Sequence, residues 1–317
     1  MTAAPLHFPR IVHGDLTKDS DLTEGELLEL LDLAAAVKQS PEVYRSRLAG
    51  KSIALLFEKP SLRTRMTFEL AIQQLGGYSI FTHDYIGSRE PLKDVARNLD
   101  RWVNAIVART YLQATVDDLA RWARVPVINA LSDTWHPCQA LADMLTIREH
   151  FGTWRGNTVA FIGDGNNVAQ SLMLNSVRLG MDFILATPAG YESSPEIVSQ
   201  ARTIAARTNT TITVTNDAAE AARDAQVIYT DTWVSMGSES EESQRHAAFR
   251  SFQVDEKLFN LAEPRAIFMH CLPAHRGDEV TDSVMESPRS VVFDQAENRL
   301  HAQKALLLML LDETTNS

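Results

Sequence analysis

One stretch, residues 52–77, sets the pattern that the rest of the chain repeats. An apolar run at 52–57 ends at Glu58-Lys59-Pro60, and apolar residues then recur at helical spacing until Gly76-Gly77 interrupts them. This order predicts a strand, a tight loop and a helix. The same alternation of strand and helix continues along the chain, which is typical of α/β folds built on parallel sheets.

The alternation falls into two halves, separated by the turn-rich segment after residue 150. Thr23 and Glu26 form a capping-box pattern for a first helix. We expect a first domain over residues 1–150, completed by a C-terminal helix from 296 to the chain end at 317, and a second domain over 151–295. The expected strands are 52–57, 78–81, 105–108, 125–128, 159–162, 183–186, 211–214, 227–229, 266–269 and 291–293. The expected helices of the first half are 64–75, 92–103, 114–123 and 136–150.

Charge and cysteine content exclude several classes of protein. The 317 residues carry 30 basic and 41 acidic side chains, a net charge of −11, which argues against a general nucleic-acid or anionic-membrane surface. The two cysteines, Cys138 and Cys271, are far apart, which argues against a disulfide framework and a structural zinc site. Neither a signal pattern nor a membrane-length apolar run occurs, so we expect a cytoplasmic protein.

The start of the helix after the first strand favours an anion. Ser61 is a natural N-cap, yet Arg63 and Arg65 fall in the first turn, where the helix dipole disfavours cations. Free backbone N–H groups, the Ser61 and Thr64 hydroxyls and one or two guanidinium groups would form a phosphate cradle. The alternative is a solvated, arginine-rich helix start.

Other polar residues also follow predicted strands, where open α/β sheets bind ligands. Arg109 ends one strand and could add another guanidinium group, although a surface arginine is the alternative. His136 and Gln139 open a helix and would face the same crevice, unless the histidine is incidental to a helix cap. Arg299 lies near the start of the last helix.

The loop Gly163-Asp164-Gly165-Asn166-Asn167 resembles a dinucleotide-binding fingerprint only weakly. Val168 takes the place of the third glycine, and the next strand ends without the acidic residue that would hold a ribose. We therefore interpret the loop as holding a small polar ligand through Asn167. A turn with Asn166 in left-handed geometry is the alternative.

Two further strand ends carry reactive groups. Asp231 could pair with a substrate ammonium, with helix or turn capping as the alternative, and the polar stretch after it could close over a ligand. His270, Cys271 and His275 suggest a metal, but adjacent residues on a strand end should point apart. We therefore expect no metal site.

Taken together, the motifs SLRTR, HPCQ, DTWVSMG, HCLPAHRGDEV and ENRLHAQKAL, with the Arg109 strand end, resemble the ornithine carbamoyltransferases. The resemblance covers nearly the whole chain in order. It implies a homotrimer with two α/β domains, the first binding carbamoyl phosphate, the second L-ornithine, and the active site between them. Carbamoyl transfer needs no cofactor.

The resemblance also implies roles for individual residues. The phosphate would be held by Ser61, Leu62, Arg63, Thr64, Arg109 and Arg299, and the carbamoyl group by His136 and Gln139. The ornithine α-amino and carboxylate end would be held by Asn167, Asp231, Ser235 and Met236. Cys271 and the Leu272 carbonyl would meet the reacting δ-amine beside the carbamoyl group. Arg109, His136 and Cys271 are the catalytic candidates, Cys271 as a polar contact rather than a nucleophile.

Two positions depart from the family pattern. Leu62 stands where the family usually has Thr, so one hydroxyl is missing while the backbone N–H remains. Tyr85 stands where the family commonly places Gln or His to reach a neighbouring subunit's phosphate.

Three other functions remain open. One is carbamoyl transfer to another amine, such as an acylated ornithine, putrescine or aspartate. A nicotinamide-dependent dehydrogenase would explain the two α/β domains and the glycine-containing loop. A non-catalytic binding protein would follow if the departures had disabled the site.

Overall fold

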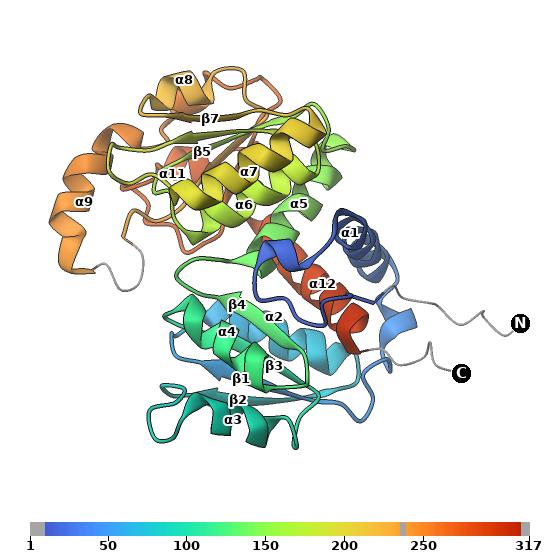
Figure 1. The fold of residues 1–317 in the computed structure, drawn as a ribbon. Coiled ribbons are helices and arrows are strands. Elements are labelled where there is room, and N and C mark those ends of the chain that lie inside the picture. The colour runs from blue at the N-terminus through green and yellow to red at the C-terminus, as the bar shows by residue number, and fades with distance from the viewer. Residues whose placement is uncertain (1–9, 235–238, 312–317) are drawn as a thin grey trace, which may run out of the picture. The chain divides into compact units, whose positions relative to one another are not determined.

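The computed structural model describes residues 10–234 and 239–311 and divides the chain into two compact units (Figure 1). Unit 1 runs to Leu145 and resumes at Arg299, and unit 2 is Thr146–Asn298. Both divisions fall inside helices, α5 (Pro137–Phe151) and α12 (Val292–Leu311), a few residues from the expected bounds at 150 and 295. Because a helix continues through each division, no turn residue marks it in the sequence.

Unit 1 is built on a four-stranded sheet whose strands are all parallel, in the order β2-β1-β3-β4. Strand β1 pairs in register from Ser52 with Tyr78 of β2 and from Ile53 with Ala105 of β3. The strands are β1 (Ser52–Phe57), β2 (Tyr78–His83), β3 (Ala105–Arg109) and β4 (Val127–Leu131). The helices are α1 (Glu24–Gln39), α2 (Leu62–Gln74), α3 (Leu92–Leu99) and α4 (Gln113–Trp122), with short 3-10 helices at Asp19–Asp21 and Pro41–Tyr44.

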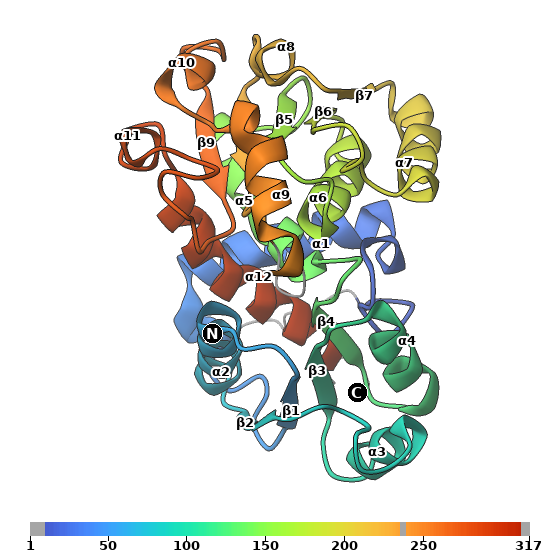
Figure 2. The same ribbon diagram turned by 90° about the vertical axis from the view of Figure 1, so that its left-hand side faces the viewer.

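Helices cover both faces of this sheet, with α2 on one side and α3 and α4 on the other (Figure 2). Alternate strand residues such as Leu56 and Ile106 pack with Val116 and Leu119 of α4 in one buried cluster. The predicted capping box is confirmed, since Thr23 accepts a hydrogen bond from the Glu26 amide and Glu26 accepts one from the Thr23 amide.

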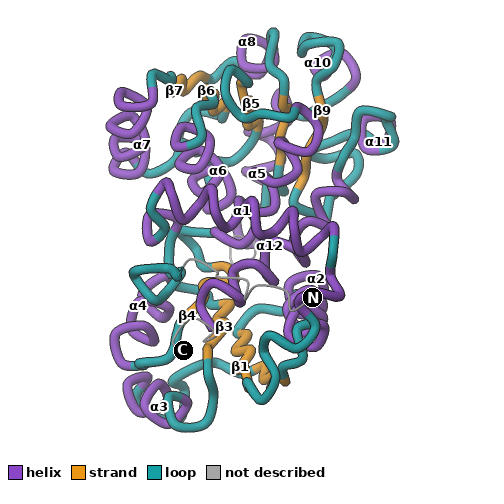
Figure 3. Tube along the Cα trace, turned by 90° about the vertical axis from the view of Figure 1, so that its right-hand side faces the viewer, coloured by secondary structure: helices purple, strands orange, loops and turns teal. Residues whose placement is uncertain are grey.

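Unit 2 is built on a five-stranded parallel sheet in the order β7-β6-β5-β8-β9. Orange strands lie among purple helices in this unit as in unit 1 (Figure 3). The strands are β5 (Thr158–Ile162), β6 (Asp182–Ala186), β7 (Ile212–Thr215), β8 (Val227–Thr230) and β9 (Ile267–His270). The helices are α6 (Asn167–Arg178), α7 (Pro195–Thr208), α8 (Ala218–Ala222), α9 (Glu242–Phe249), α10 (Glu256–Phe259) and α11 (Asp282–Met285), with 3-10 helices at Glu239–Glu241 and Arg250–Phe252.

The expected α/β fold with two parallel sheets is confirmed, but the expected strand at 291–293 is wrong. Residues 289–291 make only two backbone hydrogen bonds to β9, from Phe268 N to Arg289 O and from Val291 N to Phe268 O, and helix α12 begins at Val292. Across the residues described, the structure shows no helix with the length and apolar character needed to span a bilayer.

Candidate active-site residues

In unit 1, the first turn of α2 forms the expected N-capped start. The Ser61 hydroxyl accepts a hydrogen bond of 3.3 Å from the Thr64 amide. The Leu62 side chain is 74% exposed, and the Leu62 N–H is one of those that a helix start leaves without an intrahelical acceptor. Arg63 is half-buried, and no carboxylate in the described ranges forms an ion pair with it.

Arg65 does not belong to this group, although the sequence suggested it as a second guanidinium. Its Nε donates to Glu69 Oε1 at 2.9 Å, and its guanidinium lies 3.7 Å from the centre of the Phe81 ring. The pair with Glu69, one helical turn later, and the ring contact both occupy the Arg65 side chain. Arg63 is therefore the first-turn arginine suited to an anion.

Two arginines that are distant from α2 in the sequence also belong to this region. Arg299 contacts the start of α2, and Arg109 lies at the carboxyl end of the sheet. Arg299, on α12 and 3% exposed, donates from Nη2 to the Thr64 hydroxyl at 2.7 Å. Arg109 ends β3, where the register with β4 shifts by one residue, and is 6% exposed. The buried guanidinium groups give the cradle a concentrated positive charge, and the Ser61 and Thr64 hydroxyls add neutral hydrogen-bonding groups.

His136 directly precedes α5 and is 5% exposed. Burial, and secondarily the charges of Arg299 and Arg109, hold the pKa of His136 well below its ordinary value of 6.5. The imidazole is therefore neutral at neutral pH. It can donate a hydrogen bond to a carbonyl oxygen without adding a further charge to the cradle.

Gln139, one turn into α5, is 1% exposed. Its Nε2 donates to Asp143 Oδ1 at 2.8 Å, while its Oε1 accepts no hydrogen bond from the part of the chain that is described. A buried amide oxygen of this kind favours a ligand that brings an N–H group.

Glu58 is a site-supporting residue that the sequence analysis missed. Its Oε1 accepts from the Ile86 amide at 3.1 Å and its Oε2 from the Tyr111 amide at 2.9 Å, so it fixes the loops after β2 and β3. The Tyr85 ring stacks on the Tyr111 ring with centroids 5.3 Å apart. The position of Glu58 directly after an apolar strand is the signal that could have identified it.

In unit 2, the carboxylate of Asp231 is the centre of the candidate site. Asp231 is 6% exposed and follows β8. Its Oδ1 accepts from Cys271 Sγ at 3.0 Å and from the Thr232 amide at 2.8 Å, and its Oδ2 accepts from Asn166 Nδ2 at 2.8 Å. These contacts hold the carboxylate in one orientation beside the partly exposed Cys271 thiol.

The loop after β5 differs from the sequence interpretation in one respect. Asn166 is not left-handed, because it caps α6 with φ −77°, and its side chain accepts from the Val168 and Ala169 amides. Asn167, which we selected as the ligand-holding residue, is the first residue of α6 and is partly exposed. The sequence analysis missed that Asn166 contacts Asp231, although an asparagine before an apolar helix is a recognisable cap.

The second glycine of the loop after β5 packs closely against another segment of the chain. In a dinucleotide-binding fingerprint the second glycine lets the backbone approach the pyrophosphate. A Cβ on Gly165 would lie 2.2 Å from Ser193 N, because the segment Tyr191–Ser193 already occupies that side, held by a 2.9 Å bond from Gly165 N to Tyr191 O. The close approach that Gly165 permits is therefore one between two segments of this chain, not one between the backbone and a ligand.

The segment after β9 is fixed by a buried His–Glu pair. His270 Nε2 lies 3.1 Å from Glu279 Oε1, and His270 Nδ1 accepts from the Leu272 amide at 2.8 Å. Nε2 therefore carries the ring proton and donates a hydrogen bond to the Glu279 carboxylate. This pair holds the turn at Leu272, whose φ is +58°, in a backbone conformation that a leucine rarely adopts.

The expectation that His270 and Cys271 point apart is wrong. One ligand atom from each of Asp231, His270 and Cys271 lies within 4.8 Å of the others. However, both nitrogens of His270 are already hydrogen-bonded, and the Cys271 thiol donates to Asp231. Ser235 and Met236, the other two candidates for the ornithine end, lie outside the described residues.

Comparisons with known proteins cover nearly the whole chain. The model of the carbamoyl-P binding domain of aspartate/ornithine carbamoyltransferases matches residues 14–149, and the model of the Asp/Orn binding domain matches residues 155–310. The chain is 52% identical over 303 residues to an ornithine carbamoyltransferase of Parafrankia sp., covering 94% of this chain and 96% of the relative. It is 48% identical over 302 residues to the anabolic ornithine carbamoyltransferase of Pyrococcus furiosus, covering 94% and 96%.

Solved structures agree with the sequence comparisons. The ornithine carbamoyltransferase structure from Pyrococcus furiosus superposes with a TM-score of 0.92 at 47% identity, covering 95% of this chain and 98% of that one. The corresponding structure from Gloeobacter violaceus gives a TM-score of 0.86 at 45% identity, covering 94% and 98%.

Proposed function

Because the chain belongs to the aspartate/ornithine carbamoyltransferase family, as the motifs indicated, we propose that it transfers the carbamoyl group of carbamoyl phosphate to the δ-amine of L-ornithine. The products are L-citrulline and phosphate. The similar chains are named ornithine carbamoyltransferases, and one of them is described as anabolic. We therefore assign this protein to amino-acid biosynthesis, in the direction that leads to arginine.

Unit 1 provides the groups that carbamoyl phosphate needs. The phosphate accepts hydrogen bonds from the first-turn N–H groups of α2, from Ser61 and Thr64, and from Arg63, Arg109 and Arg299. A planar guanidinium binds two phosphate oxygens at once, and a helix start adds favourable dipole charge. The carbamoyl NH2 donates to the Gln139 Oε1 atom that accepts no other hydrogen bond in the described chain.

The neutral state of His136 suits the carbamoyl oxygen. As the amine attacks, negative charge develops on this oxygen, and donors already aimed at it lower the barrier. The lowered pKa of His136 keeps the ring a neutral donor beside Arg109 and Arg299. Preorganised donors and the alignment of two substrates supply the acceleration without a covalent intermediate.

The Asp231 carboxylate is the observation that carries the choice of ornithine. It is buried and held by Cys271 and Asn166, and no basic side chain in the described ranges pairs with it. A carboxylate so placed stabilises a free α-ammonium, whereas it would repel the carboxylates of aspartate and gain nothing from an N-acyl group. Asn167 binds the same end of ornithine, and Cys271 with the Leu272 carbonyl contacts the δ-amine.

The transfer step conserves atoms and charge simply. The uncharged δ-nitrogen forms a bond to the carbamoyl carbon, the bond from that carbon to the bridging phosphate oxygen breaks, and phosphate leaves with the electron pair. The attacking nitrogen loses one proton, which passes to the leaving phosphate. Free δ-amines resemble lysine, with a pKa of about 10.4, so most ornithine must lose a proton before it reacts.

The assembly and the cellular location are both part of the proposal, and the assembly depends on the family resemblance alone. We propose a homotrimer that acts in the cytoplasm on small-molecule substrates.

A citrulline assay with a panel of amines tests the proposed function. Ornithine, putrescine, aspartate and N-acetylornithine are each supplied with carbamoyl phosphate, and the carbamoylated product is measured. We expect ornithine to give the highest kcat/KM by a wide margin. Equal or faster reaction with aspartate or N-acetylornithine would overturn the assignment of ornithine as the substrate. If no amine gave a product, the alternative of a non-catalytic binding protein would be favoured.

The variant Asp231→Asn links the assay to the site. The substitution keeps the shape of the side chain but removes its charge, so the α-ammonium loses its partner. We expect kcat/KM for ornithine to fall by about 10²-fold or more, and that for 5-aminovalerate, which has the reacting amine and the carboxylate but no α-ammonium, to fall much less. Phosphate binding, measured by calorimetry, should not change. Equal losses for both amines would remove Asp231 from substrate choice.

A further inference from the structure

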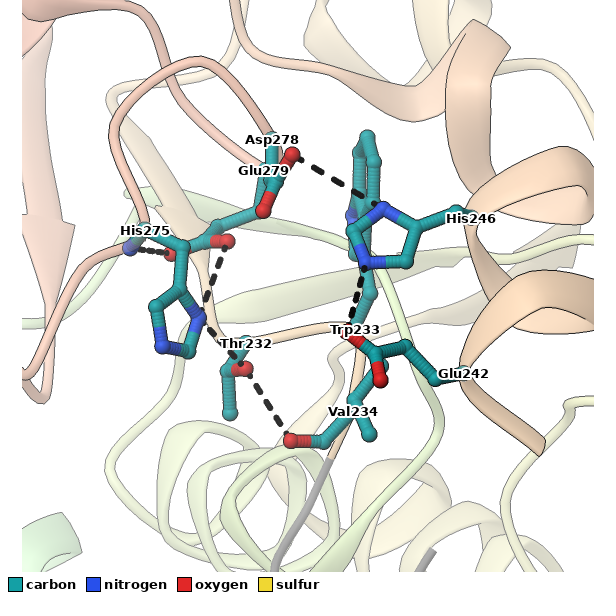
Figure 4. Close-up of a pocket in the computed structure, with 8 residues that line it drawn as sticks. All are labelled: Thr232, Trp233, Val234, Glu242, His246, His275, Asp278 and Glu279. Carbon is teal, nitrogen blue, oxygen red and sulfur yellow. Dashed lines mark hydrogen bonds and ion pairs between the residues drawn. The ribbon is translucent and has the colours of Figure 1, made fainter. Parts of the chain in front are cut away.

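A second polar pocket lies in unit 2, formed by helix α9, the residues after Asp231 and the loop after β9 (Figure 4). Figure 4 shows the imidazoles of His246 and His275 and the carboxylates of Asp278 and Glu279 turned toward the same space. The remaining lining residues are Thr232, Trp233, Val234 and Glu242.

The nitrogen and oxygen atoms in this pocket are close together. His246 Nδ1 is 3.7 Å from Asp278 Oδ1, and His275 Nδ1 is 3.8 Å from Glu279 Oε2. One ligand atom from each of His275, Asp278 and Glu279 lies within 4.8 Å of the other two. Ligand atoms bound at about 2.0–2.2 Å to one metal ion are separated by somewhat less than this, so small side-chain rotations would bring them into a coordination sphere.

Glu279 gives the pocket a buried acceptor atom that no hydrogen bond satisfies. The side chain is fully buried, and its Oε1 already accepts hydrogen bonds from His270 Nε2 and the His275 amide. Its Oε2 accepts none from the residues that the structure covers, although it lies against the pocket. A buried carboxylate oxygen left without a donor is unfavourable, and a cation bound in the pocket would satisfy it.

We propose that this pocket binds a divalent transition-metal ion through His246, His275, Asp278 and Glu279. Two imidazoles with two carboxylates suit zinc, cobalt and related ions better than calcium or magnesium, which prefer oxygen ligands alone. Glu279 is the fixed ligand. The other three side chains are 36% to 55% exposed and can move toward it.

Metal binding requires His275 to exchange its contact with Thr232 for a bond to the metal. His275 Nδ1 lies 3.1 Å from the Thr232 hydroxyl, which also lies 3.2 Å from the Val234 carbonyl. On binding through Nδ1, His275 gives up its contact with Thr232, and any proton on that nitrogen passes to solvent. The Thr232 hydroxyl keeps its bond to Val234.

The neighbouring group of Asp231, His270 and Cys271 is a competing place for the metal and must be separated in the test. It contains a thiol, whereas the pocket described above contains none among its lining residues. Cobalt reports the difference directly, because a thiolate ligand adds a charge-transfer absorption band that imidazole and carboxylate ligands do not produce.

The test uses the full-length protein after dialysis against a chelator. Cobalt(II) is titrated and its visible absorption followed, and zinc(II) binding is measured by competition. We expect one cobalt ion per chain without a thiolate band. The variants His246→Leu and His275→Leu should each weaken binding by about tenfold or more, as expected for loss of one ligand.

Two control variants keep the test specific. His150→Leu removes another partly exposed histidine paired with a carboxylate, Asp294, and Cys271→Ser removes the competing thiol. Both should bind cobalt as the unchanged protein does. A thiolate band that disappears in Cys271→Ser, equal binding by His246→Leu, or no binding with metal in large excess would each overturn the proposal.

The metal site is independent of the proposed carbamoyl transfer. Metal-free His246→Leu should form citrulline at the same rate as the metal-free unchanged protein, since His246 is not among the residues that we propose to bind either substrate. Failure to bind metal would therefore leave the citrulline assay unaffected, and failure of the assay would leave the metal titration interpretable.

Discussion

Two arginines in the first turn of α2 show how much a single contact changes the role of a residue. Arg65 is paired with Glu69 and lies on Phe81, whereas Arg63 has no carboxylate partner within the described ranges. Both have the same side chain and lie two positions apart. Their difference comes from the helical repeat, which places Glu69 one turn after Arg65 and no acidic residue one turn after Arg63.

This difference gives a matched pair of substitutions. Arg63→Lys replaces a planar, two-pronged donor by a point charge, and should weaken carbamoyl phosphate use by at least about tenfold, or about 1.4 kcal/mol. Arg65→Lys should change kcat/KM for carbamoyl phosphate little, because the Arg65 guanidinium contacts Glu69 and Phe81 and is not part of the proposed phosphate site. Steady-state kinetics at saturating ornithine measure both. Similar losses in the two variants would contradict the assignment.

His136 makes the stability of the protein depend on pH. Its pKa is lowered in the folded protein, first by burial and then by Arg299 and Arg109, whereas the unfolded chain binds the proton near pH 6.5. Below about pH 6.5 the unfolded state therefore takes up a proton that the folded state does not, and stability falls as pH decreases. Above that pH this residue adds no pH dependence.

The prediction is tested with His136→Gln, which keeps hydrogen-bonding ability but does not titrate. Between about pH 6.5 and 5 the unchanged protein should lose up to about 1.4 kcal/mol more stability per pH unit than the variant. Thermal unfolding temperatures across this range measure the difference. A parallel decline in both proteins would show that other groups cause the acid sensitivity.

At the scale of single residues, the sequence predicted those residues whose role follows from their position next to a helix or strand. Ser61 before a helix and Asp231 after a strand occupy positions with a recognised chemical use. Glu279 could not be found in this way, because its partners His270 and His275 are brought to it by the path of a loop. The same holds for the Thr64 contact of Arg299, a residue more than two hundred positions later in the chain.

At the scale of elements, the loop between β5 and α6 is shaped by one glycine. Gly165 has no left-handed requirement, but a Cβ there would lie 2.2 Å from Ser193 N and 2.6 Å from the Glu192 carbonyl carbon. Both are backbone atoms, so neither can rotate away. The close approach fixes the loop that carries Asn166 and Asn167.

Gly165→Ala should therefore destabilise unit 2 by about 1–3 kcal/mol or more, as overpacking does. The matched control is Gly25→Ala, inside α1, where an added Cβ meets nothing within 4 Å. This control should be neutral or stabilising by up to about 1 kcal/mol, because alanine favours helices. Urea unfolding of both variants gives the comparison, and equal stability of Gly165→Ala would contradict the close packing.

The strand expected at 291–293 shows where element prediction fails. Val291, Val292 and Phe293 are typical strand residues, yet α12 starts at Val292. Tertiary contacts decide the outcome: Gln295 accepts from the His270 amide and donates to the Tyr229 hydroxyl from the first turn of the helix. Periodicity identified the other strands correctly because their apolar runs are bounded by turns and followed by helices.

At the scale of the whole molecule, the chain has a net charge of −11 but concentrates buried arginines in unit 1 and a buried carboxylate site in unit 2. The order of strands and helices in the sequence was sufficient to predict two parallel sheets. It was not sufficient to place the divisions between the units, since α5 and α12 pass through them without a break.

Because these two groups of buried charges lie in different units, we predict that phosphate slows hydrogen exchange in unit 1 alone. Inorganic phosphate should slow hydrogen exchange at Leu62 and Arg63, whose amides lie in the first turn of α2, and near Arg109 at the end of β3. Peptides covering Asp231 and Cys271 in unit 2 should exchange at an unchanged rate. The reason is that, among the residues described, the amides and guanidinium groups that we propose to bind phosphate belong to unit 1, and bound phosphate gives the first-turn N–H groups the acceptor they lack.

Exchange measured by mass spectrometry, with sodium chloride at matched ionic strength as the control, tests this prediction. Arg63→Lys supplies a second control, since it should reduce the protection at Leu62 while leaving the capping bond from the Thr64 amide to Ser61 in place. Protection that spread equally over both units would mean that phosphate stabilises the protein by a general effect on its charge. Because a general effect cannot single out the first turn of one helix, the position of the slowed amides decides between the two explanations.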